Sequence, residues 1–145
     1  MRMARNKFLH GDLEPHNIFI TKTKIINGGS DFKFMIGDFG CCRKFSAPVE
    51  AFSGIIGTQL FLSPELKRAE NRLIGSFVDY YALGLIIYDM CAIDSSPGRK
   101  TRVFENGDLS YFRIHECYSA DLRNWILRLL DPDYTKRPTP DETVA

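Results

Sequence analysis

The segment His10–Ile20, which reads HGDLEPHNIFI, combines residue types that could transfer a proton and bind a metal ion. Asp12 and Asn17 stand on a loop that Pro15 keeps out of helical conformation, so both side chains can point into one cavity. A carboxylate can accept a proton, and an amide oxygen can ligate a hard cation such as magnesium. This segment is therefore the first candidate for chemistry in the chain.

The segment Gly37–Gly40, which reads GDFG, is the second candidate. An aspartate between glycines at the end of a strand has its carboxylate free to reach a metal, and the glycines allow a sharp turn. Asn17–Ile20 and Phe32–Ile36 read as the two strands of a β-hairpin around an Asn-Gly-rich turn. Asn17 and Asp38 then lie at equivalent ends of the hairpin, where their side chains can converge. Taken alone, this glycine-flanked aspartate is equally consistent with a simple turn.

Two helices are expected to position these segments. Asp79–Met90 is apolar on nearly all faces, which predicts a buried helix at the centre of the domain. Ala120–Leu130 reads as an amphipathic helix with one apolar face, made of Leu122, Trp125, Ile126, Leu129 and Leu130. Met1–Ala4 reads as the last turn of a helix. Short helices are expected from Pro64, with Ser63 as its cap, and from Lys136–Thr139.

The rest of the chain carries no clear periodicity. Lys7–Leu9 reads as a short extended piece that leads into the first candidate segment. Three stretches are predicted to be loops: Cys41–Gly57, Lys67–Ser76 and Ile93–Arg113.

Composition excludes several classes of function. The 145 residues fit one domain, and a net charge of +1 favours neither nucleic acid nor an anionic membrane as a partner. The longest apolar stretch, Tyr80–Ile93, is broken by Asp89 and falls short of the ~20 residues of a membrane span. The 4 cysteines form no C-x-x-C pair, which indicates neither a zinc site nor a disulfide framework. We expect a soluble protein with reduced cysteines, in the cytoplasm or nucleus.

These segments, in this order, resemble the C-terminal half of a eukaryotic protein kinase. The motifs that carry the resemblance are spread over nearly the whole chain. They are His10–Asn17 for H-R-D-L-x-x-x-N, Asp38–Gly40 for D-F-G, Ser63–Glu65 for A-P-E, Asp79–Gly84 for D-x-W-x-x-G, and Arg137 for the closing R-P-T. The resemblance implies a kinase-like C-lobe over residues 1–145, mainly α with a small β-hairpin. It implies a partial domain without the N-terminal lobe, since no glycine-rich phosphate loop or V-A-I-K-like lysine is present.

The resemblance also implies a role for each matched residue. Asp12 would be the catalytic base, and Asn17 and Asp38 would hold the Mg2+ ions that bridge the phosphates of ATP. Thr58 would belong to the substrate-binding segment, in a pattern of the serine/threonine type. Residues 41–62 would form the activation loop. Structural support would come from His10, Phe39, Gly40, Glu65, Asp79 and Arg137.

Two of these supporting roles imply specific contacts. Glu65 would pair with Arg137 and so tie the substrate segment to the last helices. Asp79 would bond the backbone of the catalytic loop from the buried helix.

Two departures from the family pattern leave alternatives open. Gly11 replaces the usual arginine, and Glu14 replaces the usual lysine. A carboxylate about 4 Å from a phosphate would cost roughly 4 kcal/mol at an effective dielectric constant near 20. The chain could belong to an active serine/threonine kinase that acts on protein substrates. It could instead be a catalytically inactive, pseudokinase-like lobe that binds protein partners, or a truncated product with exposed apolar surface.

Overall fold

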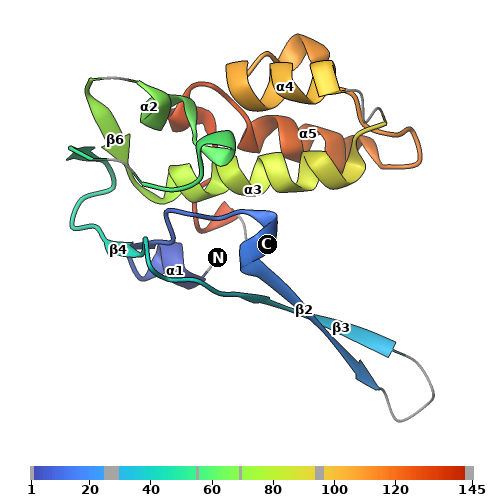
Figure 1. Ribbon diagram of the computed structural model, residues 1–145, viewed down its shortest axis with the longest axis horizontal. Coiled ribbons are helices and arrows are strands. Elements are labelled where there is room, and N and C mark those ends of the chain that lie inside the picture. The colour runs from blue at the N-terminus through green and yellow to red at the C-terminus, as the bar shows by residue number, and fades with distance from the viewer. Residues whose placement is uncertain (1, 25–29, 55, 69, 94–96, 143–145) are drawn as a thin grey trace.

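Helix α3 (Ser76–Cys91) runs through the middle of the computed structural model, which describes residues 2–24, 30–54, 56–68, 70–93 and 97–142. It packs against α5 (Ala120–Leu129), which lies alongside it in Figure 1. Among the residues of α3 only Met90 is exposed. The predicted buried helix is confirmed and begins three residues earlier than expected, at Ser76.

Apolar side chains pack against α3 in two main clusters. Tyr88 stacks on Phe112, with ring centroids 5.0 Å apart, in the cluster toward the C-terminal helices. The predicted apolar face of Ala120–Leu130 contributes Ile126 and Leu130 to this cluster. The second cluster joins the start of α3 to the first half of the chain and contains Leu9, Phe45, Ile56, Leu66, Ile74, Phe77 and Val78.

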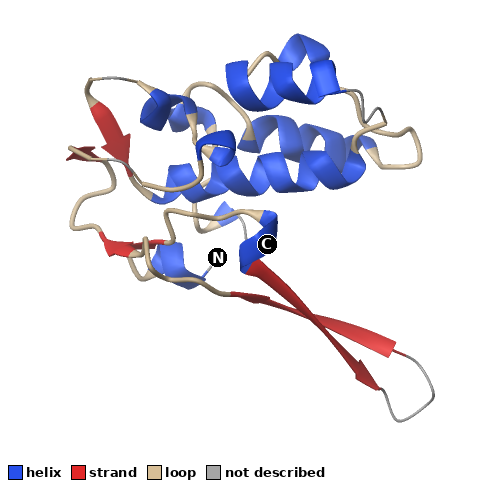
Figure 2. Ribbon diagram, viewed as in Figure 1, coloured by secondary structure: helices blue, strands red, loops and turns tan. Residues whose placement is uncertain are grey.

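Within the described residues the strands form three separate two-stranded antiparallel sheets (Figure 2). Two of these sheets are short and join segments far apart in the sequence. The pairs are β1 (Phe8–Leu9) with β4 (Arg43–Lys44), β2 (Ile18–Lys24) with β3 (Ser30–Ile36), and β5 (Glu50–Phe52) with β6 (Arg72–Ile74).

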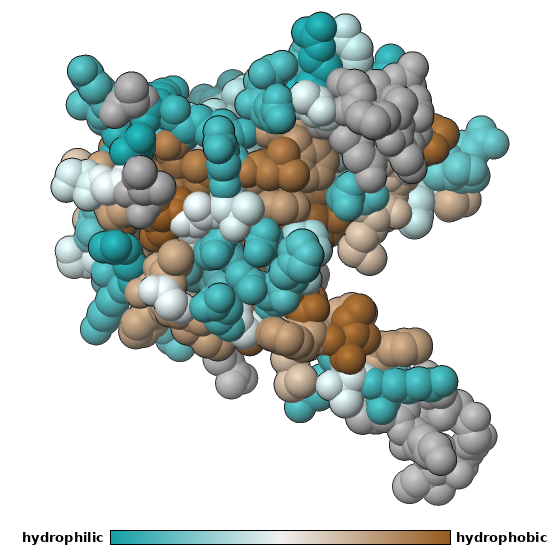
Figure 3. Space-filling model, viewed as in Figure 1, coloured by the Kyte–Doolittle hydropathy of each residue, from teal (hydrophilic) through white to brown (hydrophobic). Residues whose placement is uncertain are grey.

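The predicted hairpin is confirmed as β2 and β3, and it projects away from the helices (Figure 1). Ile20 pairs with Phe34 and Lys22 with Phe32, so these side chains share one face of the hairpin. Ile20 is 61% exposed and Phe34 is 63% exposed. Figure 3 shows apolar surface on the part of the hairpin nearest the body. The predicted turn at Asn27–Ser30 lies outside the described residues, apart from Ser30.

Shorter elements connect these parts. The short α-helices are α1 (Arg2–Arg5), α2 (Pro64–Lys67) and α4 (Pro97–Asn106). Four 3-10 turns occur in the described ranges: η1 (Pro15–Asn17), η2 (Gln59–Phe61), η3 (Leu109–Tyr111) and η4 (Tyr134–Lys136). No helix in the described part of the chain is long and apolar enough to cross a membrane. All four cysteines are free.

The three loop predictions were wrong in part. Cys41–Gly57 contains β4 and β5, and Lys67–Ser76 contains β6. Strands of two or three residues are too short to show an alternating pattern, so sequence gives no sign of them. Ile93–Arg113 contains α4 and η3. Its proline had indicated a turn, but Pro97 occupies the first position of α4, where a missing N–H costs nothing.

The predicted helix start at Pro64 is confirmed, and the predicted start at Lys136 differs from the structure. Ser63 precedes α2 as expected, but its side chain makes no capping bond, and its buried hydroxyl has no hydrogen-bond partner among the described residues. At the C-terminal end, η4 ends at Lys136, the predicted start of the last helix. Thr139 and Glu142 then bond each other reciprocally, as in a capping box, and residues 143–145 lie outside the described part.

Candidate active site

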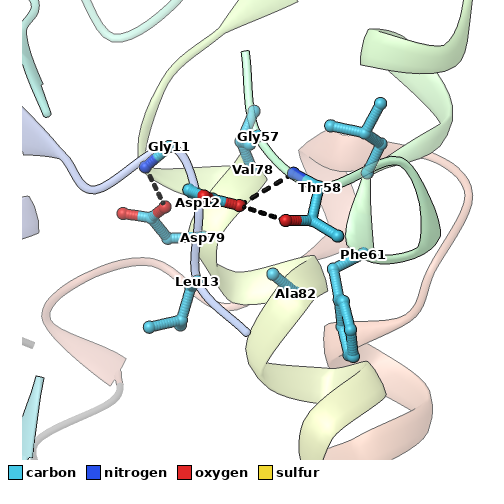
Figure 4. Close-up of a pocket in the computed structure, with 10 residues that line it drawn as sticks. Gly11, Asp12, Leu13, Gly57, Thr58, Phe61, Val78, Asp79 and Ala82 are labelled. Atoms are coloured by element: carbon cyan, nitrogen blue, oxygen red, sulfur yellow. Dashed lines mark hydrogen bonds between the residues drawn. The ribbon is translucent and has the colours of Figure 1, made fainter. Parts of the chain in front are cut away.

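Asp79 fixes the loop of the first candidate segment to helix α3. It lies in the first turn of α3, is buried, and accepts hydrogen bonds from the backbone N–H groups of His10 (2.7 Å) and Gly11 (3.0 Å). Figure 4 shows the bond from Gly11. Burial raises the pKa of Asp79 to about 6, although the two N–H donors act in the opposite direction. The contact that the resemblance implied is present, and it anchors the loop to a rigid element.

His10 connects this loop to the segment that contains Asp38. Its ring is fully buried, and Nε2 lies 3.0 Å from the carbonyl oxygen of Gly37. Nδ1 accepts a hydrogen bond from the backbone N–H of Asp12 at 3.4 Å, which assigns the proton to Nε2. The ring also meets Phe39 edge-on, with centroids 5.3 Å apart. Both candidate segments are thus packed on one imidazole.

Asp12 contacts the predicted substrate segment directly. Its Oδ1 accepts two hydrogen bonds from Thr58, one from the backbone N–H and one from Oγ1, each 2.8 Å long (Figure 4). A small cavity of about 10 Å³ lies between the two segments, which is room for about one water molecule. No bond to Oδ2 is formed within the described residues, so this oxygen remains available.

Two glycines allow the loop and the substrate segment to approach each other. Gly11 and Gly57 both have φ near +81°, a conformation that L side chains rarely adopt. A Cβ on Gly57 would stand 2.5 Å from the carbonyl oxygen of Gly11. A Cβ on Gly11 would stand 2.6 Å from Cδ1 of Ile56 and 2.9 Å from the carbonyl oxygen of Cys41. Gly11 is therefore more than a lost arginine, because a side chain at this position would be strained.

Asn17 and Asp38 lie at the same end of the hairpin. The backbone N–H of Gly37 donates to the carbonyl oxygen of Asn17 at 2.9 Å, which places the two strand ends side by side. Asn17 is buried and its Nδ2 donates to the carbonyl oxygen of Asp12 at 2.9 Å, while its Oδ1 accepts no bond from the described residues. Asp38 is exposed, and its Oδ1 accepts a 3.2 Å bond from the N–H of Gly40.

This pair of oxygen donors suits a hard cation. An amide oxygen and a carboxylate are ligands that magnesium accepts, and magnesium keeps several waters or phosphate oxygens besides. In the described ranges no group of three or more His, Cys, Asp or Glu side chains could hold a metal on its own. The donor set therefore fits a partly hydrated ion that a substrate phosphate also contacts. That the two side chains converge on one ion stays a prediction.

Glu65 and Arg137 form a buried, bidentate ion pair. Arg137 Nη1 lies 2.7 Å from Glu65 Oε1, and Nη2 lies 2.9 Å from Oε2. The arginine also donates to the carbonyl oxygens of Phe77 and Asp131, and its guanidinium lies over the ring of Tyr81. The implied contact between α2 and the segment after α5 is present.

Glu14 has little to balance its charge. Its side chain is 17% exposed, and Oε1 lies 3.9 Å from Nδ1 of His16, which is charged only when protonated. No ion pair between Glu14 and a lysine or arginine occurs within the described residues.

Sequence analysis missed a second, larger cavity beside Thr58. It has a volume of about 750 Å³, and its charged lining residues are Lys67, Arg72 and Glu105. These residues come from α2, β6 and α4, and the last two elements had been predicted as loops. Nothing in their spacing indicates a common site.

The comparisons with known proteins agree with this arrangement. Residues 3–145 match the protein kinase domain. Mouse serine/threonine-protein kinase Nek1 is 32% identical over 136 residues, which cover 92% of this chain and 10% of that protein. The zebrafish (Danio rerio) serine/threonine-protein kinase Nek8 is 30% identical, with coverage of 94% and 19%. The chain belongs to the protein kinase domain family.

A fungal protein kinase is also similar to this chain. The G2-specific protein kinase nimA of Emericella nidulans is 30% identical over 140 residues, with 94% of this chain and 18% of that protein covered. The chain thus spans about a tenth to a fifth of the length of these three curated relatives.

Proposed function

We propose that the chain is the catalytic-loop part of a serine/threonine protein kinase, which transfers the γ-phosphoryl group of ATP to protein hydroxyls. The observation that carries the proposal is the environment of Asp12. Thr58 occupies Oδ1 with two bonds, and Oδ2 is left to accept a proton from a substrate hydroxyl. A base that is held at one oxygen and open at the other is oriented for general-base catalysis.

The remaining residues position this base. Asp79 and His10 hold the backbone on either side of Gly11, so Asp12 cannot move independently of α3. Oδ1 of Asn17 and the carboxylate of Asp38 would hold Mg2+. When bound, the metal ions would neutralise charge on the phosphates of ATP. Family membership supports the use of ATP and Mg2+ in general.

The substrate class and setting are part of the same proposal. Several relatives are named serine/threonine-protein kinases, and Thr58 stands where the serine/threonine pattern places it. The substrates would be proteins with accessible serine or threonine. We further propose that residues 1–145 correspond to part of a kinase C-lobe. Four free cysteines suit a reducing compartment, cytoplasmic or nuclear.

The test is phosphoryl transfer by the polypeptide that carries these residues, compared with its Asp12→Asn variant. Asparagine keeps an oxygen that can accept both bonds from Thr58, so the segment stays in place while the base is lost. We expect the transfer rate to fall by roughly 10²–10⁴-fold. Thermal unfolding of both proteins provides the control for structure. Equal rates in the two proteins would contradict the proposal.

A second candidate function is an inactive lobe that binds other proteins, which the charge of Glu14 favours. A carboxylate in place of the family's lysine opposes the binding of phosphate. The unfolding temperature in the presence of ATP distinguishes the two functions. ATP should raise it for a kinase, but only when Mg2+ is present, and should not change it for an inactive lobe.

Restoring the cation tests the role of Glu14 itself. If Glu14 limits activity, Glu14→Lys should raise the transfer rate by roughly tenfold or more, with Glu14→Gln between the two. Unchanged rates in both variants would show that Glu14 does not face the phosphates.

A further inference from the structure

The larger cavity beside Thr58 is lined by both apolar and charged residues. Its volume is about 750 Å³, and it shares Gly57 with the small cavity next to Asp12. It therefore continues from the site of the proposed base. The apolar lining residues, called the floor below, are Leu60, Leu62 and Leu66. Figure 1 shows that the elements around it, α2, β6 and α4, lie on the side of α3 opposite the hairpin.

The two cations of this cavity are held by backbone carbonyl oxygens. Arg72 donates from Nε and Nη1 to the backbone carbonyl oxygens of Leu66, Arg68 and Gly54. Lys67 donates from Nζ to the backbone carbonyl oxygens of Phe104 and Glu105. Within the described residues neither cation forms an ion pair with a carboxylate. Carbonyl oxygens orient these side chains but carry no full negative charge, so they do not neutralise either cation.

The charge balance of the cavity favours an anion. Lys67 and Arg72 together outweigh the single acidic residue, Glu105, in the lining. Burial lowers the pKa of Lys67, while the charge of Glu105 raises it, which agrees with a cation that is short of negative partners. An incoming carboxylate would restore the balance and would gain strength from the partly buried setting.

We propose that this cavity binds a glutamate side chain of the peptide substrate, a few residues from the hydroxyl that reaches Asp12. The carboxylate would lie between Lys67 and Arg72, and the methylene groups would pack on the leucines. Glutamate suits the floor better than aspartate because its longer stem covers apolar surface while its head stays with the cations. The proposal rests on the proposed function, since it assumes that a peptide substrate extends from Asp12 along the segment of Thr58.

Binding of short peptides to the full chain tests this proposal without catalysis. Each peptide carries a fluorescein label and has alanine in place of the serine that would be phosphorylated. One flanking position is Glu, Gln or Leu. This position is varied in turn on both sides of the alanine. Fluorescence anisotropy in the absence of ATP gives the dissociation constants. We expect the best Glu peptide to bind about five- to tenfold tighter than its Gln counterpart.

Charge variants identify the cavity as the binding site. Lys67→Gln should remove the preference for Glu over Gln, whereas Lys67→Arg should keep it. Glu105→Gln, at an exposed position, should strengthen binding of the Glu peptide a few-fold without disturbing the fold. Lys33→Gln, in the hairpin away from the cavity, should leave binding unchanged and serves as the matched control.

Three results would overturn the proposal. These are tighter binding of the Leu peptide than the Glu peptide, an unchanged preference in both Lys67→Gln and Glu105→Gln, and no saturable binding of any peptide. The first would assign the cavity to an apolar side chain.

Phosphoryl transfer is measured separately from peptide binding. If the preference for the Glu peptide is absent but phosphoryl transfer is intact, only the proposal about the cavity is contradicted. The Glu preference without transfer contradicts the proposed function alone.

Discussion

The two carboxylate oxygens of Asp12 have different hydrogen bonds. Oδ1 accepts two bonds from Thr58, and Oδ2 accepts none within the described residues. The pair of bonds from one threonine opposes rotation of the carboxylate. If Asp12 is the base that we propose, this arrangement supplies positioning, which accounts for much of the catalysis of phosphoryl transfer.

Restoring the family's arginine at position 11 should destabilise this chain. Gly11→Arg would place a side chain at φ +81°, with its Cβ 2.6 Å from Ile56 Cδ1. We expect the free energy of unfolding in urea to fall by roughly 1–3 kcal/mol. Gly11→Ala is the matched control and should lose a similar amount, because the strain lies in the backbone and the Cβ. Full stability of both variants would contradict this account.

At the scale of elements, Asp79 makes the attachment of the loop to α3 depend on pH. Its folded-state pKa of about 6 lies above the ordinary value of 3.8, so the folded protein binds this proton more tightly than the unfolded chain. Its contribution therefore favours folding most below pH 4 and is lost as the pH rises through 6.

The comparison with Asp79→Asn isolates that contribution. The stability of the wild type relative to this variant should decrease by roughly 2–3 kcal/mol between pH 4 and pH 7. Urea unfolding of both proteins at several pH values measures the difference, in which other titrating groups cancel. A difference that does not vary with pH would show that the carboxyl does not titrate in this range.

The ion pair between Glu65 and Arg137 joins α2 to the segment after α5. Both side chains are almost fully buried, so removal of one partner leaves an uncompensated charge in the interior. Arg137→Met should cost roughly 3–5 kcal/mol in the free energy of unfolding. The double variant Glu65→Met with Arg137→Met should recover part of that loss, since it buries no charge. A double variant less stable than the single one would indicate that the pair acts through other contacts.

Periodicity and turn chemistry predicted the long elements, whereas the long-range contacts that were predicted came from the family resemblance alone. Helix α3 and the β2–β3 hairpin follow from periodicity and turn chemistry, both local properties. The bond between Asp12 and Thr58 spans 46 positions, and no local pattern encodes it. The charged cavity was missed for the same reason, because its walls come from elements distant in sequence. Gly11 was interpreted as the loss of a cation, and only the backbone conformation revealed that glycine is favoured there.

At the scale of the whole molecule, the hairpin exposes apolar side chains, and three of them lie together on one face. Ile20, Phe32 and Phe34 share this face and are each more than half exposed. Such a face is a site for association, and the unpaired edges of a two-stranded sheet add to this tendency. We expect the chain to self-associate at micromolar concentrations.

Two substitutions on the hairpin test this expectation. Ile20→Thr with Phe34→Thr keeps β-forming residues but removes apolar area, and should weaken self-association by roughly tenfold or more. Light scattering coupled to size-exclusion chromatography gives the molar mass as a function of concentration. Lys33→Gln, on the opposite face, should change nothing. A wild-type chain that stays monomeric at all concentrations would contradict the prediction.

The ion pair also bears on how the protein is made. Arg137 leaves the ribosome 72 residues after Glu65, and at a synthesis rate of about 5–20 residues per second this delay lasts several seconds. During that interval Arg137 has not been synthesised, so the carboxylate of Glu65 lacks its ion-pair partner. Burial of an unpaired charge is unfavourable. Helix α2 and the neighbouring substrate segment should therefore close only when the last part of the chain arrives. A nascent chain stalled before Arg137 should remain open to proteases near Pro64.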